Sequence, residues 1–390
     1  MIFIKRIFVI VLDSLGIGEM HDAEAFGDKF SNTLKSLYNT KKLNIPNLMK
    51  LGITKIEGNE YFNDKTENIA SIARMSEKSN GKDTTVGHWE IMGVVSEKPF
   101  PTYPNGFPND IIKKFEEKTE KNVLCNKPYS GTQVLIDYGE EHENTNSLIV
   151  YTSADSVFQI AAHEQKTPIN ELYKYCEIAR SILKDEHAVA RVIARPFVGE
   201  YPHYTRTPNR HDYSLAPPKM TALDYIKNKG FDVISVGKIN DIFSGQGITK
   251  SIPTKSNKDG MNKTTEISKT NFNGLCFVNL VDFDSTYGHR NDVNGYTEAL
   301  NEFDLWLGDF IANMNDRDIL FVTADHGCDP NTESTDHSRE YTPMLCYGKN
   351  ITQKNLGTRQ SFADIGKTIL DMLEIENDIE GESFYSIIRK

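Results

Sequence analysis

The stretch IFVIVLDS, residues 7–14, is a run of apolar, mostly β-branched residues that ends at Asp13. Three further runs share this character: DVISV at 232–236, LCFVNLV at 275–281 and ILFVT at 319–323. Short apolar runs bounded by polar residues or glycine are typical of strands buried on both faces of a parallel sheet. We therefore predict that these four segments are core strands.

The segments between these strands carry a helical pattern. Residues 299–314 place apolar side chains at helical spacing on one face, and residues 361–374 repeat the pattern. The polar segment 251–271, rich in Lys, Asn and Thr, is predicted to be a solvated loop or hairpin. Strands that alternate with helices predict an α/β fold with a mainly parallel sheet.

Two proline clusters, KPFPTYPNGFP at 98–108 and LAPPKM at 215–220, interrupt this pattern. Because proline favours turns and extended connectors, we interpret the clusters as hinges around an inserted domain of about 115 residues, a size that can fold independently. The insert has elements of its own. Strands are predicted at 147–154 and 189–197, and an amphipathic helix is predicted at 168–183.

Composition argues against several classes of protein. The 390 residues carry 44 Lys and Arg against 55 Asp and Glu, and this net charge of −11 disfavours binding to the nucleic-acid backbone. The five cysteines form no C-x-x-C pair, which indicates a reducing compartment rather than a disulfide framework or a zinc–thiolate site. The first apolar run is too short for a signal peptide, and no other stretch is long enough to span a bilayer. We expect a cytoplasmic monomer that binds neither nucleic acid nor membranes.

Aspartate and histidine side chains follow three of the predicted strands, where active sites of open α/β sheets gather. Three carboxylates and three imidazoles suit two divalent cations such as Mn²⁺, Zn²⁺ or Fe²⁺ better than Ca²⁺. Each aspartate alone is more simply a helix cap or turn residue, but the set predicts a two-metal site. Spacing leaves Asp282 and Asp336 open as alternatives to Asp284 and His337. The candidate ligands are Asp13, Asp284, His289, Asp325, His326 and His337.

The segment GKDTTVGHWEIMG, residues 81–93, predicts a helix that Thr84 or Thr85 opens. Free backbone N–H groups at a helix N-terminus can hold a phosphate, and a nearby metal can activate a hydroxyl as a nucleophile. The simpler alternative is that both threonines only cap the helix, but the metal set favours a nucleophile. Trp89 is expected in the core, and His88 is a candidate to line the site.

Together these motifs resemble the bacterial phosphopentomutases, a family of the alkaline phosphatase superfamily. TADHG with a downstream DHSRE is typical of the superfamily, whereas GKDTT-x-GHWE and TSADSVFQIAAHE are typical of the phosphopentomutase branch. The resemblance runs from the first strand to the C-terminal helix. The first loop departs from the family pattern G-x-x-P-D-A, because the stretch from Gly18 to Ala23 lacks the proline, but this loop contains no candidate ligand.

The resemblance implies a fold in two parts. An alkaline-phosphatase-like α/β core would comprise residues 1–98 and 218–390, and a smaller α/β cap, residues 99–217, would bind the substrate. Arginines can hold the non-reacting phosphate of a sugar phosphate with a bidentate fork, although each alone could form an exposed ion pair of little consequence. The substrate-binding residues that the resemblance implies are Asp155, Arg191, Arg195, Arg206, Arg210 and Lys238.

The same resemblance assigns catalytic roles. Thr85 is implied to carry the phosphoryl group beside two metal ions, typically manganese. A sugar bisphosphate, either glucose 1,6-bisphosphate or ribose 1,5-bisphosphate, is implied as activator. The implied ligands of one metal are Asp13, Asp325 and His326, and those of the other are Asp284, His289 and His337.

The expected reaction interconverts (deoxy)ribose 1-phosphate and (deoxy)ribose 5-phosphate through a phosphothreonine enzyme and a 1,5-bisphosphate, in nucleoside catabolism and pentose phosphate metabolism. Closure of the cap would exclude water from the phosphoenzyme. Three alternatives remain open: a metal-dependent phosphatase or phosphodiesterase of the same superfamily, a cofactor-independent phosphoglycerate mutase, and a metal-stabilised binding protein without catalysis. Release of free phosphate, activity on 3-phosphoglycerate, or retained metal without turnover would distinguish them.

Overall fold

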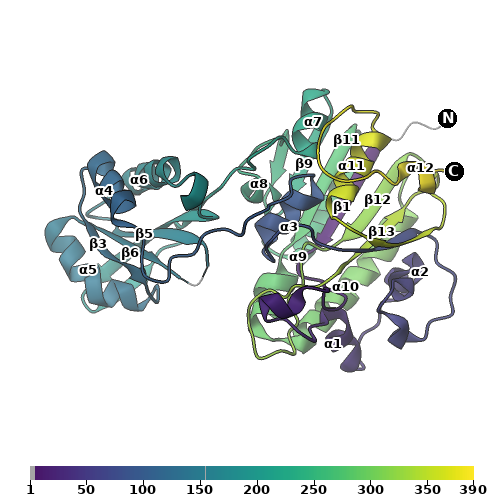
Figure 1. The fold of residues 1–390 in the computed structure, drawn as a ribbon, viewed down its shortest axis with the longest axis horizontal. Helices are drawn as coiled ribbons and strands as arrows, with labels where there is room; N and C mark the ends of the chain where they lie inside the picture. The colour runs from purple at the N-terminus through teal and green to yellow at the C-terminus, as the bar shows by residue number, and fades with distance from the viewer. Residues whose placement is uncertain (1–4, 154) are drawn as a thin grey trace. The chain divides into compact units, whose positions relative to one another are not determined.

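A computed structural model describes residues 5–153 and 155–390, which form two compact units (Figure 1). The larger unit comprises the described residues up to Lys98 together with Pro217–Lys390, and the smaller unit comprises Pro99–Ala216. The chain therefore passes between the units twice. The α/β class expected from the sequence is confirmed, because helices cover a mainly parallel sheet in the larger unit.

The larger unit is built on an eight-stranded sheet. Its strands are β1 (Arg6–Leu12), β2 (Ser71–Met75), β9 (Asp232–Val236), β10 (Lys250–Ile252), β11 (Gly274–Leu280), β12 (Asp318–Thr323), β13 (Thr342–Tyr347) and β14 (Asn355–Arg359). Their order is β10-β9-β11-β1-β12-β13-β2-β14. The strands from β10 to β12 run parallel, and β13 runs antiparallel to both its neighbours. The carboxyl ends of β11, β1 and β12 consequently lie side by side.

Helices cover both faces of this sheet (Figure 1). They are α1 (Thr33–Asn39), α2 (Pro46–Leu51), α3 (Thr84–Ile91), α7 (Ala222–Asn228), α8 (Ile239–Ile242), α9 (Asn257–Ser268), α10 (Val293–Ala312), α11 (Ala363–Met372) and α12 (Tyr385–Ile388). Side chains alternate along a strand, so β1 contributes to the core on both faces of the sheet. Phe8, Ile10 and Leu12 point to one face and pack with α1, α2, α9 and α10. On the opposite face, Phe277 lies beside Val9 in register and contacts His88 of α3.

The prediction of a loop or hairpin over 251–271 is wrong, because α9 occupies most of that segment. The Ser256 side chain caps this helix by accepting the backbone N–H of Asp259 at 3.2 Å. Met261 and Ile267 bury a narrow apolar stripe against the sheet. Two buried apolar side chains in a polar background were too weak a periodic signal for sequence reasoning.

The smaller unit has its own six-stranded sheet and two hydrophobic clusters, one on each face. Its elements are α4 (Asn109–Thr119), β3 (Val123–Pro128), α5 (Gln133–Thr145), β4 (Leu148–Thr152), β5 (Val157–His163), α6 (Ile169–Ile182), β6 (Arg191–Glu200), β7 (His203–Arg206) and β8 (His211–Ser214). The strand order is β3-β4-β5-β6-β7, and β8 also pairs with β6. Helices α4 and α6 cover one face, and α5 covers part of the other. Ala154, the last residue of the strand predicted at 147–154, lies outside the described residues.

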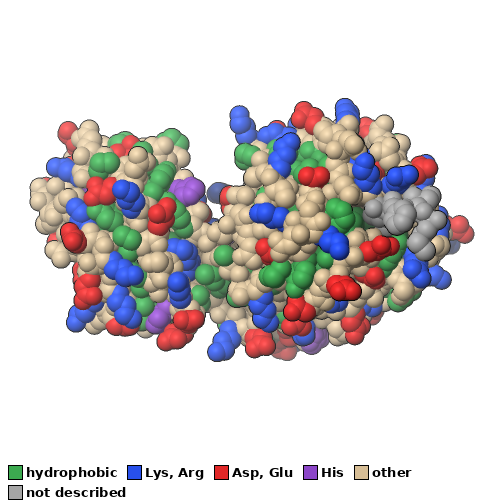
Figure 2. Space-filling model, turned by 90° about the horizontal axis from the view of Figure 1, so that it is seen from above, with side chains coloured by type: hydrophobic (Ala, Val, Ile, Leu, Met, Phe, Trp, Pro, Cys, Tyr) green, Lys and Arg blue, Asp and Glu red, His purple; other side chains and the backbone are tan. Residues whose placement is uncertain are grey.

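Acidic and basic side chains are interspersed over both units on the face seen in Figure 2. The net charge of −11 is therefore not gathered into one acidic surface on this face. Among the described helices, none combines the length and apolar character that crossing a membrane requires.

Candidate functional site

The carboxyl ends of β1 and β12 bring the first group of candidate ligands together. Asp13 directly follows β1, and Asp325 and His326 follow β12 after one intervening alanine. The Nε2 atom of His326 lies 3.3 Å from Asp13 Oδ1 and 3.3 Å from Asp325 Oδ2. Ligand atoms of these three residues lie within 4.8 Å of one another, and all three residues are buried. A single cation could contact all of them.

A second group forms around Asp284, which lies in a π-helical turn (Phe283–Tyr287) just beyond β11. Turns of this kind are frequent at functional sites. His289 Nε2 lies 3.2 Å from Asp284 Oδ2, and His337 Nε2 lies 3.5 Å from Asp284 Oδ1. The rings of His326 and His337 have centroids 4.1 Å apart, so the two groups are contiguous. All six candidate ligands thus meet at one edge of the sheet.

Unpartnered polar atoms at this edge fit a pair of cations. Four buried atoms there make no well-aligned hydrogen bond, although carboxylates and imidazoles of the site lie 3.0–3.5 Å apart: Asp13 Oδ1, Asp284 Oδ1, Asp325 Oδ2 and His337 Nε2. Buried polar atoms are rarely left unpaired, and a metal ion would satisfy every one of these. Two imidazoles are also oriented by backbone carbonyls, since His326 Nδ1 lies 2.9 Å from the oxygen of Gly327 and His289 Nδ1 lies 2.6 Å from that of Thr335. Donation from Nδ1 leaves Nε2 as the metal-binding atom.

The electrostatics of the cluster reflect crowded carboxylates. Burial, together with the nearby charges of Asp325 and Asp284, raises the pKa of Asp13. Burial also opposes ionisation of Asp284, but His337 and His289 outweigh it and hold its pKa well below the usual range. The hydrogen bond to Asp284 raises the pKa of His289 to about 8. Three buried carboxylates in one cluster call for positive charge, which divalent cations supply.

Three further residues belong to this site although sequence reasoning gave them no firm role. Asn279 Nδ2 donates to Asp13 Oδ2 at 2.7 Å, and His88 Nδ1 lies 3.0 Å from Asp325 Oδ2. The thiol of Cys328 lies with ligand atoms of Asp284 and His289 in a group that spans 4.8 Å. Asn279 could have been found from the sequence, because it is the one strongly polar residue in the apolar run 275–281.

The two alternative ligands that spacing left open are engaged elsewhere. Asp282 Oδ2 accepts the backbone N–H of Asn257 at 2.7 Å. Asp336 Oδ2 lies 3.3 Å from Lys82 Nζ. Neither carboxylate occurs in the ligand groups that the described residues form, whereas Asp284 and His337 do.

The threonine helix α3 begins beside the first ligand group. Its N-cap is Asp83, whose Oδ1 accepts the backbone N–H of Thr85 at 3.0 Å and of Val86 at 3.1 Å. The threonine hydroxyls therefore do not cap the helix, and two of the backbone N–H groups at its N-terminus, where free groups for a phosphate were expected, are occupied by Asp83. Thr84 Oγ1 instead lies 3.1 Å from Nε2 of His326.

The smaller unit gathers arginines on one face of its sheet. Paired residues of neighbouring strands point to the same side, and pairing sets Arg191 and Arg195 of β6 on the face that also carries Asp212. Arg210 forks onto Asp212 with two contacts of 2.7 Å, and Arg191 Nη1 lies 3.7 Å from the same carboxylate. Burial and the charges of Arg210 and Arg206 lower the pKa of Arg195.

Five of the six predicted substrate-binding residues thus lie in the smaller unit, and three of them, Arg191, Arg195 and Arg210, are in contact with or close to Asp212. Arg206 Nε donates to the carbonyl oxygen of Gly131 at 3.1 Å. Asp155 is exposed in the loop between β4 and β5. Lys238 is an exposed residue of the larger unit and precedes α8.

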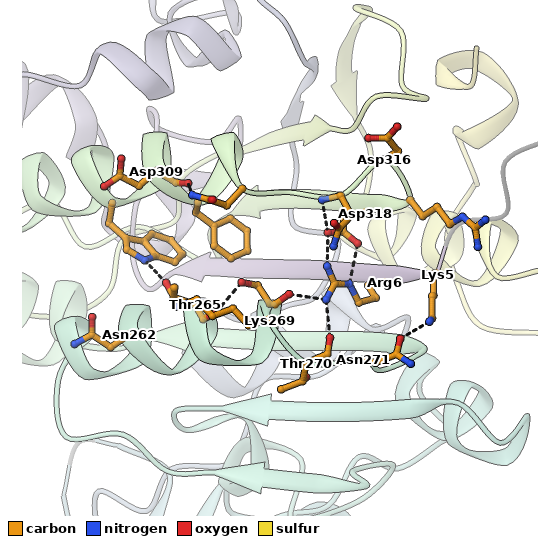
Figure 3. A pocket seen from close by; sticks show the side chains of 16 residues that line it. Lys5, Arg6, Asn262, Thr265, Lys269, Thr270, Asn271, Asp309, Asp316 and Asp318 are labelled. Atoms are coloured by element: carbon orange, nitrogen blue, oxygen red, sulfur yellow. Dashed lines mark hydrogen bonds and ion pairs between the residues drawn. The ribbon is translucent and has the colours of Figure 1, made fainter.

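A cavity of about 1130 Å³ lies elsewhere, at the amino ends of β1 and β12 (Figure 3). Its polar groups are largely paired: Arg6 forks onto Asp318 at 2.8 and 2.6 Å, and Trp306 donates to Thr265 at 2.9 Å. This cavity lies at the opposite edge of the sheet from the aspartate–histidine cluster. Size alone therefore does not make it the reactive site.

The family model of the metalloenzyme superfamily matches residues 5–377. The chain is 58% identical over 382 residues to the phosphopentomutase of Lachnoclostridium phytofermentans, covering 97% of this chain and 98% of that protein. It is 53% identical over 386 residues to the phosphopentomutase of Acetivibrio thermocellus, covering 98% and 100%.

Among solved structures, PH0037 from Pyrococcus horikoshii matches with a TM-score of 0.49 and 16% identity, over 97% of this chain and 100% of that one. The phosphoglycerate mutase of Leishmania mexicana matches with a TM-score of 0.47 and 11% identity, over 97% of each chain.

Proposed function

The chain belongs to the phosphopentomutase family of the metalloenzyme superfamily and is a sugar phosphate mutase; from this premise we propose how its residues carry out the reaction. The substrates are (deoxy)ribose 1-phosphate and (deoxy)ribose 5-phosphate. Phosphorylated Thr85 gives its phosphoryl group to the free hydroxyl of either one, and the product of that transfer is the 1,5-bisphosphate. Return of the other phosphoryl group to Thr85 completes the interconversion.

Each transfer balances without water. The bond between phosphorus and Thr85 Oγ breaks, a bond between phosphorus and the sugar oxygen forms, and the proton of the sugar hydroxyl ends on Thr85. The observation that carries this proposal is the contact of 3.1 Å between Thr84 Oγ1 and His326 Nε2, because it brings the start of α3 against the ligand cluster. Thr85, the next residue, lies in the first turn of the same helix.

We propose that Asp13, Asp325 and His326 hold one divalent cation and that Asp284, His289 and His337 hold the other. Two such cations, which we take to be Mn²⁺, would neutralise charge on the phosphoryl oxygens and would activate the threonine hydroxyl. Asn279 and His88 keep the Asp13 and Asp325 carboxylates in place through the contacts described above. A sugar bisphosphate such as glucose 1,6-bisphosphate or ribose 1,5-bisphosphate phosphorylates Thr85 and so activates the enzyme.

Substrate recognition is proposed for the arginine face of the smaller unit. Arg191, Arg195 and Arg210 share the carboxylate of Asp212, and Arg206 adds its charge beside Arg195. This group of arginines suits the phosphate that does not react. Asp155 would accept hydrogen bonds from ribose hydroxyls, and Lys238 would contribute a further positive charge. Five unpaired cysteines, four of them buried, favour a cytoplasmic enzyme. We expect it to be a monomer.

The test compares Thr85→Ala with Thr84→Ala. Ribose 1-phosphate, Mn²⁺ and a trace of glucose 1,6-bisphosphate are supplied, and ribose 5-phosphate and free phosphate are followed together. Thr85→Ala should lose transfer by at least about 10³-fold, as expected when the covalent nucleophile is removed, and should carry no phosphate by mass spectrometry. Thr84→Ala should remain phosphorylated on the Thr85 peptide. Full activity of Thr85→Ala would overturn the assignment, and free phosphate without ribose 5-phosphate would indicate a hydrolase.

A further inference from the structure

We propose that Arg339 is a positioning residue that holds the loop 77–83, and with it the start of α3, against the metal-binding loop that contains His337. The proposal rests on the proposed role of the α3 threonines. Arg339 itself touches neither the ligand cluster nor Thr85 in any recorded contact of the described residues. Its effect on the reaction would therefore act through the loop.

The Arg339 guanidinium is buried, and its Nη1 and Nη2 groups donate hydrogen bonds mainly to this loop. Nη1 donates to the Glu77 carboxylate at 2.7 Å and to the carbonyl oxygens of Ser79, at 2.9 Å, and Gly81. Nη2 donates to the carbonyl oxygen of Glu77 at 3.0 Å and to Asp22 at 3.0 Å. Three carbonyls within five residues are thereby fixed by one planar group.

Only arginine can make this set of contacts. The guanidinium offers five donors in a rigid fork, whereas a lysine ammonium is a compact group with three donors. The ring of Phe26 packs against the guanidinium at 4.7 Å from its centroid, and Asp22 faces the Nε side at 3.2 Å. The loop after β1 therefore also contacts the Arg339 guanidinium. We call Arg339 and the groups that its guanidinium contacts the Arg339 clamp.

A second set of contacts joins the clamp to the ligand loop. Arg339 is two residues beyond His337, and its backbone N–H donates to Asp28 at 2.9 Å. The Asp28 carboxylate also binds Lys82 at 3.0 Å, and Lys82 in turn lies 3.3 Å from Asp336. Lys82 directly precedes Asp83, the N-cap of α3. The His337 loop and the threonine helix are thus connected through two basic residues, Arg339 and Lys82.

Helix α3 holds the loop from its other side. Glu90, near the end of α3, accepts the backbone N–H of Lys78 at 2.8 Å and of Ser79 at 2.6 Å. The loop is therefore fixed between Glu90 and Arg339. If the Arg339 contacts are weakened, the loop loses one of these two supports, and the first turn of α3 can move relative to His326.

The experiment compares Arg339→Lys with a matched control, Arg6→Lys. Both arginines are buried, with side-chain exposures of 4% and 6%, and both fork onto carboxylates and donate to carbonyls. Arg6, however, lies at the opposite edge of the sheet (Figure 3). We expect kcat of Arg339→Lys to fall by about 10²-fold, since a displacement near 1 Å costs that much. The KM for ribose 1-phosphate and the affinity for Mn²⁺ should change less than about threefold, because Arg339 contacts neither a predicted substrate-binding residue nor a metal ligand among the described residues, and ground-state binding should be preserved.

Two readouts separate positioning from general destabilisation. Hydrogen exchange of amides 77–87 should increase in Arg339→Lys but not in Arg6→Lys, even if both variants melt at lower temperature. Millimolar guanidinium should restore part of the kcat of Arg339→Gly and none of any loss in Arg6→Gly. Unchanged kcat in Arg339→Lys, or equal loss of kcat in both lysine variants, would overturn the proposal. If the wild-type protein carried no phosphate on Thr85, the function would fail while the exchange measurement still decided the role of Arg339.

Discussion

At the scale of single residues, the aspartate–histidine cluster links protons to metal binding. A histidine must lose its proton before Nε2 can bind a metal. The hydrogen bond to Asp284 raises the pKa of His289 to about 8. We therefore expect the affinity of the metal-free protein for Mn²⁺ to rise with pH through about 8, as measured by calorimetry across a buffer series.

The contribution of His289 to the free energy of unfolding of the metal-free protein should decrease as pH rises. A histidine pKa that folding raises stabilises the fold fully below the unfolded value, about 6.5. That contribution is lost as pH rises through about 8. His289→Asn is the control for this prediction. The variant should bind Mn²⁺ more weakly, and its Mn²⁺ affinity should no longer change with pH near 8. Affinity that is flat from pH 6 upward in the unmodified protein would contradict this linkage.

Most residues of the candidate site, but not all, could be predicted from the sequence. The six ligand candidates follow strand ends, and the structure gathers all six. Spacing alone left the choice between Asp284 and Asp282 open, whereas the family resemblance implied Asp284. The structure places Asp284 in a π-helical turn, which has no sequence signal of its own. The role of Asp83 as N-cap was also missed, because two threonines beside it offered equally good capping groups.

At the scale of elements, the decisive contact is the packing of α3 on the end of β12. Gly87 leaves no room for a side chain, since an added Cβ would collide with the carbonyl oxygen of Asp325. Gly87→Ala must therefore push α3 away from the ligand cluster. We expect a loss of about 1–3 kcal/mol in the free energy of unfolding, as for overpacked sites, and a larger proportional loss of kcat.

The matched control is Gly260→Ala on α9. An added Cβ there approaches only the end of the flexible Leu280 side chain and a methyl group of Thr254. Alanine has a higher helix propensity than glycine by about 1 kcal/mol, so this variant should be neutral or more stable. Thermal denaturation with parallel rate measurements checks both variants. Activity retained in Gly87→Ala would show that the close approach is not needed for transfer.

Elements were predictable where their patterns were strong. The buried runs that became β1, β9, β11 and β12 could be read directly, because strands covered on both faces are apolar throughout. Helix α9 could not be read, because its buried stripe is narrow.

At the scale of the whole molecule, the smaller unit is expected to fold alone. Residues 99–216 contain a complete sheet and two hydrophobic clusters, and domains of this size commonly fold independently. The excised segment should unfold cooperatively in urea, and calorimetry of the full chain should show two transitions. Phe158→Ala should lower only the transition of the smaller unit, by about 3–5 kcal/mol. Phe303→Ala should lower only the other. A fragment without a cooperative transition would contradict this expectation.

The split of the larger unit has a consequence for its synthesis. Strand β1 emerges from the ribosome first, yet its neighbours in register begin at Gly274 and Asp318. At about 5–20 residues per second, the strand waits on the order of 10–60 s for the first of them. The smaller unit is complete by Ala216 and can fold in that interval. The most apolar strand of the enzyme is therefore the segment of the nascent chain with the greatest need of a chaperone.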